Sequence, residues 1–247
     1  MVSKSLPSFD IATYNIHSCI GTDRRFNPPR IVEILNRLDA DVLALQEVGW
    51  HQRGHPVFDQ FDYLRQTTGY AVYSGLTRDH SRAHFGNAIL SRLPVRAVRH
   101  IDLTVPCRAP RCAVDADIDV TGTLVRVINL HLGLDPWERQ VQFKRILRAI
   151  EARPTQPLVM LGDFNEWRLD FPPFKDLAPH FPHCLAPRTF HTRRPMFRYD
   201  RIYASGDFAL TESYVKRTAL TRRASDHLPV FGRLALEAAT ADQVMAA

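Results

Sequence analysis

Apolar residues recur along the chain in short runs of strand length, separated by polar loops. A short apolar run without helical spacing is typical of a strand buried on both faces. Two of these runs flank Thr121 and Gly122, so we expect them to form an antiparallel hairpin. The pattern predicts strands over residues 9–15, 41–46, 87–91, 113–120, 124–130, 158–161, 201–204 and 230–236.

Helical spacing of apolar residues occurs in residues 28–38 and in residues 137–151. In the first segment, Ile31, Ile34, Leu35 and Leu38 fall on one face of a helix. Pro28 and Pro29 suit its first turn. Since hairpins and crossover helices are both expected, the chain reads as an α/β protein with mixed sheets covered by helices.

The chain shows neither an internal repeat nor a low-complexity linker. We therefore expect a single domain over residues 9–236. Residues 1–8 read as an N-terminal extension, and the small and polar residues 237–247 read as a frayed C-terminal tail.

Charge is unevenly distributed along the 247 residues, whose net charge is +6. Between Arg188 and Arg223 there are nine basic and three acidic residues, a surplus as large as that of the whole chain. Such a segment suggests a partner that carries phosphate, either nucleic acid or a phospholipid headgroup. A solvated basic face is an equally good reading, since Arg outnumbers Lys 28 to 4 throughout.

Neither a signal peptide nor a membrane span is evident in the sequence. The four cysteines are too scattered for a disulfide scaffold or a zinc knuckle, so we expect reduced thiols. These features predict a cytoplasmic protein without a transmembrane segment, and nothing in the sequence calls for an obligate protein partner.

Polar side chains stand at or near the ends of several predicted strands, where ligands gather in layered α/β proteins. A single Asp or Asn in such a place is more often a turn or helix cap. The whole set, however, supplies oxygen ligands for a hard divalent cation, histidines that can move protons and acids that can orient them. These are the ingredients of metal-assisted hydrolysis at phosphorus, and the set comprises Asn15, His17, Gln46, Glu47, Asn129, His131, Asp163, Asn165, Asp200, Asp226 and His227.

The order of these residues resembles that of the endonuclease/exonuclease/phosphatase family, the superfamily of deoxyribonuclease I. The resemblance covers residues 9–236 and is strongest to small bacterial members. It rests on Asn15, "LQEV" with Glu47, "HFGNAILSR" with Asn87, "NLHLG" with His131, "LGDFN" with Asp163 and Asn165, "RYDRIY" with Asp200, and "SDH" with Asp226 and His227. It implies a four-layered α/β sandwich: two mixed β-sheets packed face to face, helices outside, and an active site at one edge.

The resemblance also implies a metal site and a general base. Glu47 would be the main ligand of a Mg²⁺ or Mn²⁺ ion, or alternatively of Ca²⁺, with Asn15 beside it and Asp226 contributing. His227 would be the general base, held by Asp200 in the tautomer that accepts a proton from the attacking water.

Three further residues would complete the site by the same resemblance. His131 would face the phosphate from the other side as proton donor or charge stabiliser. Asp163 would orient the nucleophile, and the Asn165 amide would donate to a phosphoryl oxygen. Family members leave open whether the base is Asp163 or His227. We favour His227, because an aspartate beside a cation is a weak base.

The sequence departs from some family patterns. Abasic-site nucleases have Tyr in place of His131 and Asp in place of His17, so we do not expect a dedicated abasic-site repair enzyme; His17 remains a candidate substrate contact. Deoxyribonuclease I supports its first histidine with a glutamate, which "HFGNAILSR" lacks. Asn87 is then either a phosphate contact or a structural residue. Arg168 and Arg201 are either phosphate contacts or partners in salt bridges at the sheet edge.

Together these features predict a divalent-metal-dependent phosphoesterase that most resembles a nuclease and hydrolyses phosphodiesters. The alternative within the same chemistry is a phosphodiesterase or phosphatase that acts on phospholipids or small molecules at a membrane surface. A second alternative is a non-catalytic module that binds nucleic acid or a partner. The presence of every residue of the catalytic set argues against that module.

Overall fold

The first sheet brings strands from both ends of the chain together. The computed structural model describes residues 7–51, 58–80, 83–153 and 157–237. The strand order is β12-β13-β1-β2-β5-β4, and the short β3 (Phe58–Asp59) pairs with β2. In that order the bounds are Phe208–Val215, Val230–Leu236, Ser8–Asn15, Val42–His51, Ala83–Ser91 and Ala71–His80. Ser8 already pairs with Ala235, whereas residues 1–6 and 238–247 of the predicted extension and tail lie outside the described residues.

The second sheet has the order β10-β11-β9-β8-β7-β6. In that order the bounds are His183–Leu185, Asp200–Ala204, Leu158–Asp163, Thr123–His131, Cys112–Val120 and Val95–Asp102. The hairpin predicted at Thr121 and Gly122 joins β7 to β8, and both turn residues have the positive φ that such a tight turn requires.

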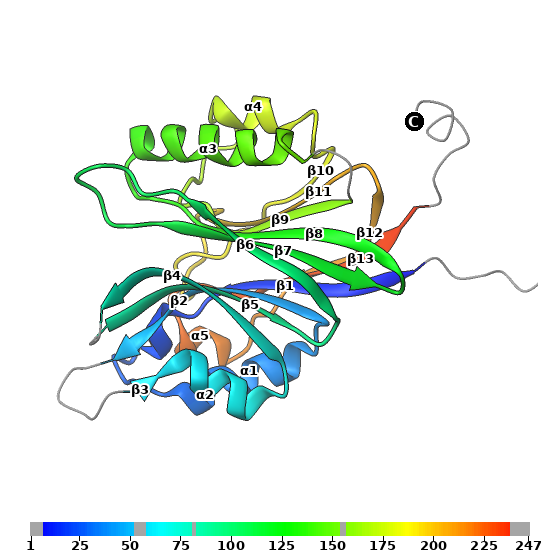
Figure 1. The fold of residues 1–247 in the computed structure, drawn as a ribbon. Helices are drawn as coiled ribbons and strands as arrows, with labels where there is room; N and C mark the ends of the chain where they lie inside the picture. The colour runs from blue at the N-terminus through cyan, green and yellow to red at the C-terminus, as the bar shows by residue number, and fades with distance from the viewer. Residues whose placement is uncertain (1–6, 52–57, 81–82, 154–156, 238–247) are drawn as a thin grey trace, which may run out of the picture.

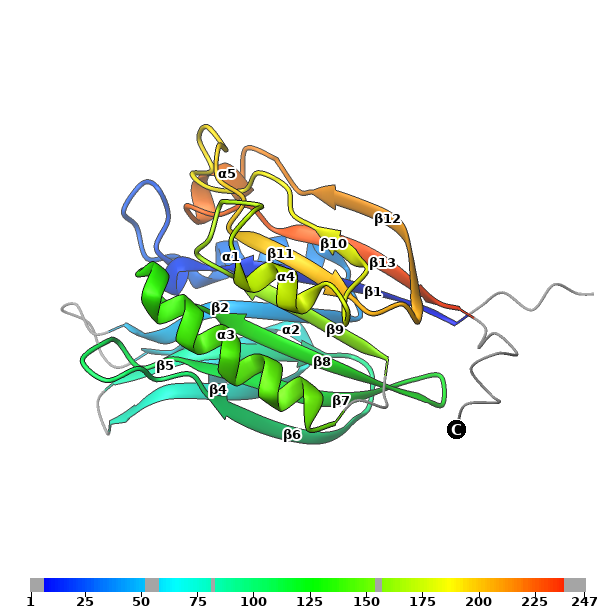
Figure 2. The ribbon, with the colours of Figure 1, turned by 90° about the horizontal axis from the view of Figure 1, so that it is seen from above.

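The two sheets pack face to face with helices on their outer faces (Figure 1). Helices α1 (Pro28–Leu38), α2 (Gln60–Thr68) and α5 (Thr221–Ala224) lie on the first sheet, and α3 (Pro136–Glu151) and α4 (Pro173–Leu177) lie on the second (Figures 1 and 2). One apolar core fills the space between the sheets, and a further core lies under each helical layer. The four-layered sandwich that the resemblance implied is confirmed. Among the described helices, none is both long and apolar enough to cross a membrane.

The eight strands predicted from the sequence are the eight central strands of the two sheets. The strands that the pattern missed include all four edge strands, β12, β4, β10 and β6. An edge strand is only partly covered, so its residues alternate between half-buried and exposed, as in β6. The pattern also missed β3, α2, α4 and α5, which are short and offer few apolar positions.

Strand direction explains why polar residues gather at one edge. β1 pairs with β2 in parallel, and β8 pairs with β9 in parallel, so the carboxyl ends lie together within each pair. The Asn15 side chain at the end of β1 donates to Asp163 at the end of β9 at 3.0 Å, so both pairs end at the same edge of the sandwich. The antiparallel β11 starts at this edge, with Asp200 opposite Asp163. In the first sheet, the loop before the antiparallel β13 returns to the same edge and carries Asp226 and His227.

Candidate active site

Residues at the ends of β1 and β9 and within β2 are joined by one amide. The Asn15 Nδ2 group donates to Glu47 Oε1 and to Asp163 Oδ2, both at 3.0 Å. Its Oδ1 accepts the backbone N–H of His17 at 3.0 Å, and a flipped amide would place two donors face to face there. Asn15 therefore presents its nitrogen to the site and bridges a carboxylate of the first sheet to one of the second.

Glu47 reaches the site because β2 bulges at this point. The pairing of β2 with β5 shifts between Leu45 and Val48, and Glu47 has a φ of 56°. A bulge re-aims a side chain that regular pairing would direct elsewhere. The Glu47 side chain is 24% exposed, while the neighbouring Gln46 is fully buried.

Gln46 and Asn129 form a polar link between the sheets. Gln46 Nε2 donates to Asn129 Oδ1 at 2.7 Å. The Asn129 Nδ2 group donates to the carbonyl oxygens of Leu45 and Ala88 at 3.0 and 2.8 Å. Because these buried groups satisfy one another, Gln46 and Asn129 hold the two sheets together rather than offer ligands.

Asp163 lies between two histidines. Its Oδ2 is 3.7 Å from His131 Nε2 and 3.6 Å from His227 Nε2, and its Oδ1 accepts the Asn165 backbone N–H at 2.9 Å. Burial raises the pKa of the Asp163 carboxyl to about 6, although the positive charge of His227 opposes that shift. A group with such a pKa can carry or lose a proton near neutral pH.

His227 is held by a buried aspartate. Asp200 Oδ2 accepts the His227 Nδ1 hydrogen bond at 2.8 Å and a second one from the Thr189 hydroxyl. Burial opposes charge on His227, but the carboxylates of Asp200 and Asp163 outweigh burial and raise the His227 pKa to about 10. With Nδ1 bound to Asp200, the Nε2 atom is the one that faces the site.

His131 has a cationic partner, Arg111, which the sequence analysis missed. Arg111 Nη1 lies 2.9 Å from His131 Nδ1, and since a guanidinium only donates, Nδ1 must be the acceptor. The neutral His131 therefore carries its proton on Nε2, 4.0 Å from Glu47 Oε1. Burial, the Arg111 charge and His227 all hold the pKa of His131 well below its usual range. His131 is thus a neutral hydrogen-bond donor.

The loop before β13 closes the other side of the site. Ser225 Oγ donates to the Asn15 carbonyl oxygen at 2.7 Å, and the Thr192 N–H donates to the Asp226 carbonyl oxygen at 2.7 Å. The Asp226 carboxylate is 25% exposed, with Oδ1 3.8 Å from His17 Nδ1. Asp226 and His17 consequently lie together at the rim.

Asn165 follows β9 in a left-handed conformation, with a φ of 49°. Its Nδ2 donates to the Leu132 carbonyl oxygen at 2.8 Å, which ties the segment after β9 to the segment after β8. One N–H of that amide remains for another acceptor.

Comparison with known proteins bears on this arrangement. A model described as "Endonuclease/Exonuclease/phosphatase family" matches residues 12–227. The chain belongs to this family. It is also 28% identical, over 246 residues, to "Uncharacterized protein YbhP" of Escherichia coli (strain K12), with 93% of this chain and 97% of that protein covered.

Solved structures show the same fold at low sequence identity. An endonuclease/exonuclease/phosphatase from Beutenbergia cavernae DSM 12333 is 22% identical with a TM-score of 0.77, over 94% of this chain and 72% of that chain. The mannosyl-6-phosphatase of Bacteroides thetaiotaomicron VPI-5482 is 18% identical with a TM-score of 0.71, over 92% of this chain and 100% of that chain. The chain therefore has the fold of phosphoester-hydrolysing enzymes.

Enzymes of the endonuclease/exonuclease/phosphatase family typically use divalent metals, and the donor set here fits such an ion. Glu47 and Asp226 present partly exposed carboxylates, the oxygen ligands that Mg²⁺ and Mn²⁺ prefer. Among the described residues, Asp163, Asp200 and His227 also place ligand atoms within 4.8 Å of one another. Because Asp200 and His227 are already hydrogen-bonded and buried, we interpret this trio as a proton-carrying group.

Three candidate phosphate contacts, Asn87, Arg201 and Arg168, form structural hydrogen bonds or ion pairs. Asn87 is buried, and its Nδ2 donates across the sandwich to the Cys112 carbonyl oxygen at 2.7 Å. Arg201 is 1% exposed and donates to the backbone carbonyl oxygens of Glu166 and Arg168, so it cannot reach the site. Successive residues of a strand point to opposite faces, so Arg201 points away from the face that Asp200 occupies.

Arg168 pairs with Glu166. Its Nε and Nη2 donate to the two carboxylate oxygens at 2.9 and 2.8 Å. Arg139 binds the same buried carboxylate at 2.9 Å. Arg168 therefore forms a salt bridge, one of the two roles expected for it. The pair of Arg168 and Glu166 organises the loop that carries the exposed Trp167.

Aromatic rings lead from the surface to His227. Exposed Trp167 contacts Phe197 at 6.0 Å between ring centroids, and Phe197 stacks on Tyr199 at 5.5 Å. Phe190 contacts both Tyr199 and His227, at 5.1 and 4.9 Å. These rings form one wall beside the general-base candidate.

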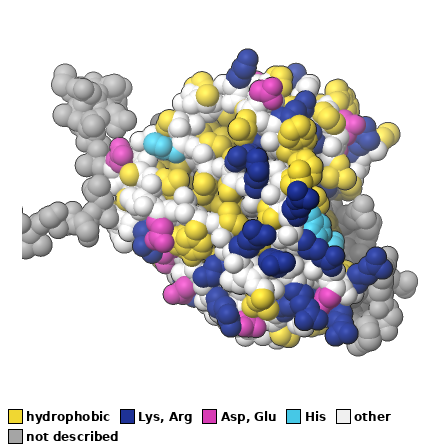
Figure 3. Space-filling view, turned by 180° about the vertical axis from the view of Figure 1, so that it is seen from behind, with side chains coloured by type: hydrophobic (Ala, Val, Ile, Leu, Met, Phe, Trp, Pro, Cys, Tyr) yellow, Lys and Arg dark blue, Asp and Glu magenta, His cyan; other side chains and the backbone are white. Residues whose placement is uncertain are grey.

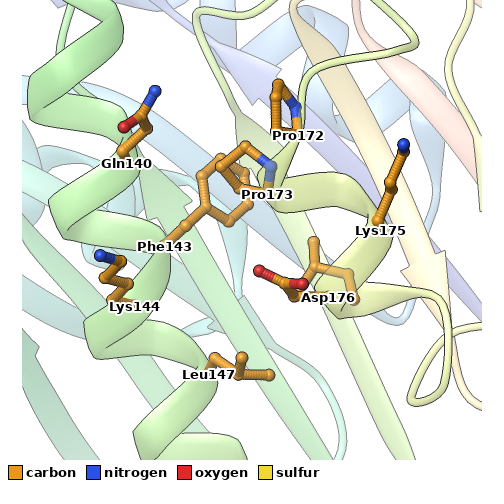
Figure 4. Close-up of a pocket in the computed structure, with 9 residues that line it drawn as sticks. Gln140, Phe143, Lys144, Leu147, Pro172, Pro173, Lys175 and Asp176 are labelled. Atoms are coloured by element: carbon orange, nitrogen blue, oxygen red, sulfur yellow. The ribbon is translucent and has the colours of Figure 1, made fainter.

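A separate cavity of about 400 Å³ lies between α3 and α4 (Figure 4). Its lining includes Phe143, Leu147 and Pro173, and none of the predicted site residues contributes to it. The candidate site is therefore defined by converging polar side chains rather than by this cavity.

Proposed function

We propose that this protein is a divalent-metal-dependent phosphoesterase that hydrolyses phosphodiester bonds by attack of water, with His227 as general base. The observation that carries the proposal is the buried pair of Asp200 and His227, whose Nε2 faces Asp163 while His131 faces the same carboxylate from the other side. This arrangement supplies a base on one side of a phosphate and a hydrogen-bond donor on the other.

The Asp200 carboxylate holds the His227 ring and its tautomer. With Nδ1 committed to Asp200, a neutral His227 has its lone pair on Nε2 and accepts the proton of the attacking water there. The nearby carboxylates favour the protonated form, so a base at neutral pH requires positive charge near them. Asp163, next to Nε2, orients the nucleophile.

Glu47 and Asp226 would hold a Mg²⁺, Mn²⁺ or Ca²⁺ ion at the partly exposed mouth of the site. The ion supplies charge that polarises the phosphoryl group and offsets the surrounding carboxylates. Asn15 keeps Glu47 in place through its Nδ2 hydrogen bond, so its part is to position that carboxylate rather than to offer oxygen.

Two donors would stabilise the negative charge that develops on the phosphoryl oxygens. His131 presents its Nε2–H, because Arg111 occupies Nδ1. Asn165 presents the amide N–H that Leu132 does not use. Donors fixed before the reaction stabilise developing charge without reorganising.

The test is hydrolysis of bis-p-nitrophenyl phosphate, plasmid DNA and phospholipid vesicles with Mg²⁺, Mn²⁺ or Ca²⁺. The His227→Ala variant should lose about two to four orders of magnitude in turnover on any substrate that the protein cleaves. His180→Ala, in the loop after α4, is the matched control and should retain activity. Full activity in His227→Ala would refute the mechanism, and inactivity on every substrate would favour a binding module.

A phospholipid substrate at a membrane surface is the second candidate. Large apolar side chains are exposed in the segments that follow His131, follow Asn165 or precede Asp200. They include Leu134, Trp137, Trp167, Leu169 and Met196. Exposed Trp and Leu near a site are typical of surfaces that meet lipid. Preferential cleavage of phospholipid vesicles over DNA would select this candidate.

A further inference from the structure

Three arginines converge on one surface concavity beside the catalytic edge. A pocket of about 380 Å³ is lined by Arg193, Arg222, Arg223 and Ala219; we call it the arginine pocket. Gathering like charges is unfavourable unless an anion offsets them. Asp23, which pairs with Arg223, is also bound by Arg30, so it does not neutralise the cluster.

Two of the three guanidinium groups are held in place. Arg193 Nη2 donates to the Thr22 carbonyl oxygen at 3.0 Å, and Arg223 Nε donates to Asp23 Oδ2 at 2.8 Å. The Thr22 N–H in turn donates to the Arg223 carbonyl oxygen at 3.0 Å. The pocket is therefore organised before any ligand arrives, which reduces the entropy lost on binding.

The third guanidinium is available. Within the described parts of the chain, the Arg222 side chain makes no hydrogen bond or ion pair. Its charge is therefore not balanced locally. A guanidinium binds phosphate with two parallel hydrogen bonds, and three such groups around one concavity match the oxygens of a phosphate.

Two segments that line the arginine pocket are linked to Asp226, one along the chain and one through a backbone hydrogen bond. Arg223 lies three residues before Asp226 in the chain, which limits the distance between their Cα atoms to about 11 Å. On the other side, Arg193 follows Thr192, whose N–H donates to the Asp226 carbonyl oxygen at 2.7 Å. A substrate bound at the catalytic edge can therefore reach the pocket with a neighbouring group.

The surrounding surface favours an anion as well. Seen from behind, the side on which α5 lies, Lys and Arg side chains gather with few acidic ones among them (Figures 2 and 3). A basic surface raises the local concentration of anions. A solvated basic face would explain the excess charge, but it would not explain why three guanidinium groups share one pocket.

We propose that the arginine pocket binds a second phosphate group of the substrate, distinct from the phosphate that is hydrolysed. The inference rests on the proposed phosphoesterase function and sharpens it, because it selects substrates that carry at least two phosphate groups. A terminal phosphate of an oligonucleotide and a second phosphate of a small phosphoester share this chemistry.

The kinetic test compares substrates with one and with two phosphates. In the first pair, a dinucleotide with a single phosphodiester is compared with the same dinucleotide carrying a 5′ or a 3′ terminal phosphate. In the second pair, bis-p-nitrophenyl phosphate is compared with a small substrate bearing an added phosphomonoester. Arg222→Gln should raise KM for the two-phosphate substrates about tenfold, as for loss of one charge-assisted hydrogen bond, and leave their kcat unchanged. Whichever pair shows the effect identifies the source of the phosphate.

The control is Arg148→Gln, an exposed arginine on α3 whose KM values should match those of the wild type. Equal KM values for Arg222→Gln and wild type on all two-phosphate substrates would overturn the proposal. So would the same KM increase on one-phosphate and two-phosphate substrates.

A binding measurement separates this proposal from the proposed function. Inorganic phosphate titrated into ¹⁵N-labelled protein should shift the Nε–Hε signals of Arg193 and Arg223, with about tenfold weaker binding in Arg222→Gln. This readout needs no turnover. Saturable shifts in a protein that cleaves nothing would support the pocket while refuting the phosphoesterase, and no shift, or equal affinity in the variant, would overturn the pocket itself.

Discussion

Replacing Arg111 by Met tests whether a cation fixes the tautomer of His131. The variant keeps an unbranched apolar side chain but removes the donor that lies 2.9 Å from His131 Nδ1. Without that donor, Nδ1 can carry the proton and Nε2 can lose it. The Nε2–H that points toward Asp163 and Glu47 would then be present in only part of the molecules.

The size of the effect follows from the burial and charge of this contact. The His131 side chain is 5% exposed, and a buried hydrogen bond from a charged donor contributes about 1.5–3 kcal/mol. If that free energy is realised in the transition state, kcat/KM falls about 10- to 100-fold. Loss of the Arg111 charge also raises the pKa of His131. Because a protonated His131 carries a proton on both ring nitrogens, the defect of the variant relative to the wild type should shrink as the pH is lowered.

The assay combines steady-state kinetics with ¹⁵N NMR of the histidine ring. In the wild type, His131 should show a protonated Nε2 and an unprotonated Nδ1, and in Arg111→Met a mixture of both forms. Arg111→Lys keeps a charged donor and should lose less activity. Arg108→Gln changes an exposed arginine in the same loop and serves as the control. Unchanged kcat/KM together with an unchanged tautomer in Arg111→Met would refute the reasoning.

Three further predictions concern the metal site, the sheet and stability. Glu47→Ala should weaken the metal dependence of any activity, and an unchanged metal titration would remove Glu47 from the ligand set. Gly162→Ala should destabilise the fold, because a Cβ there would lie 2.0 Å from the Leu130 carbonyl oxygen; unaltered thermal unfolding would contradict this. Burial disfavours the Glu166 carboxylate, but Arg168 and Arg139 outweigh burial and lower its pKa to about 2. The resulting stability is present above pH ~4.3, the pKa in the unfolded chain, and is lost as the pH falls toward 2. Urea unfolding should therefore show the wild type and Glu166→Gln converging in that window, whereas a pH-independent difference would refute the ion-pair explanation.

The site residues illustrate what a linear pattern can and cannot predict. Asp163 and Asp200 stand at the ends of apolar strands, so their side chains were recognisable as candidates without coordinates. Arg201 offered the same kind of signal, yet it is buried with its guanidinium on backbone carbonyl oxygens. Successive residues of a strand point to opposite faces of the sheet, so only one of two neighbouring polar residues can face the site. Which face of the sheet is covered depends on where the helices pack.

Contacts between distant segments left no trace in the sequence. Arg111 reaches His131 across the sheet, and Thr189 donates to Asp200, but neither pair shows a characteristic spacing. The arginine pocket likewise combines Arg193 with residues of α5, so the sequence showed only a basic segment and not a shared concavity.

The eight central strands and the polar residues at their ends were recognisable from the amino-acid pattern. Burial on both faces demands continuous apolar runs, and that demand is readable in any chain. The tertiary structure alone decided where the sheets end, since edge strands are half exposed and carry mixed patterns. It also decided which polar groups meet: Asn15 and Asp163 are 148 residues apart in the chain and 3.0 Å apart in space, a proximity that only the pairing of two sheets produces.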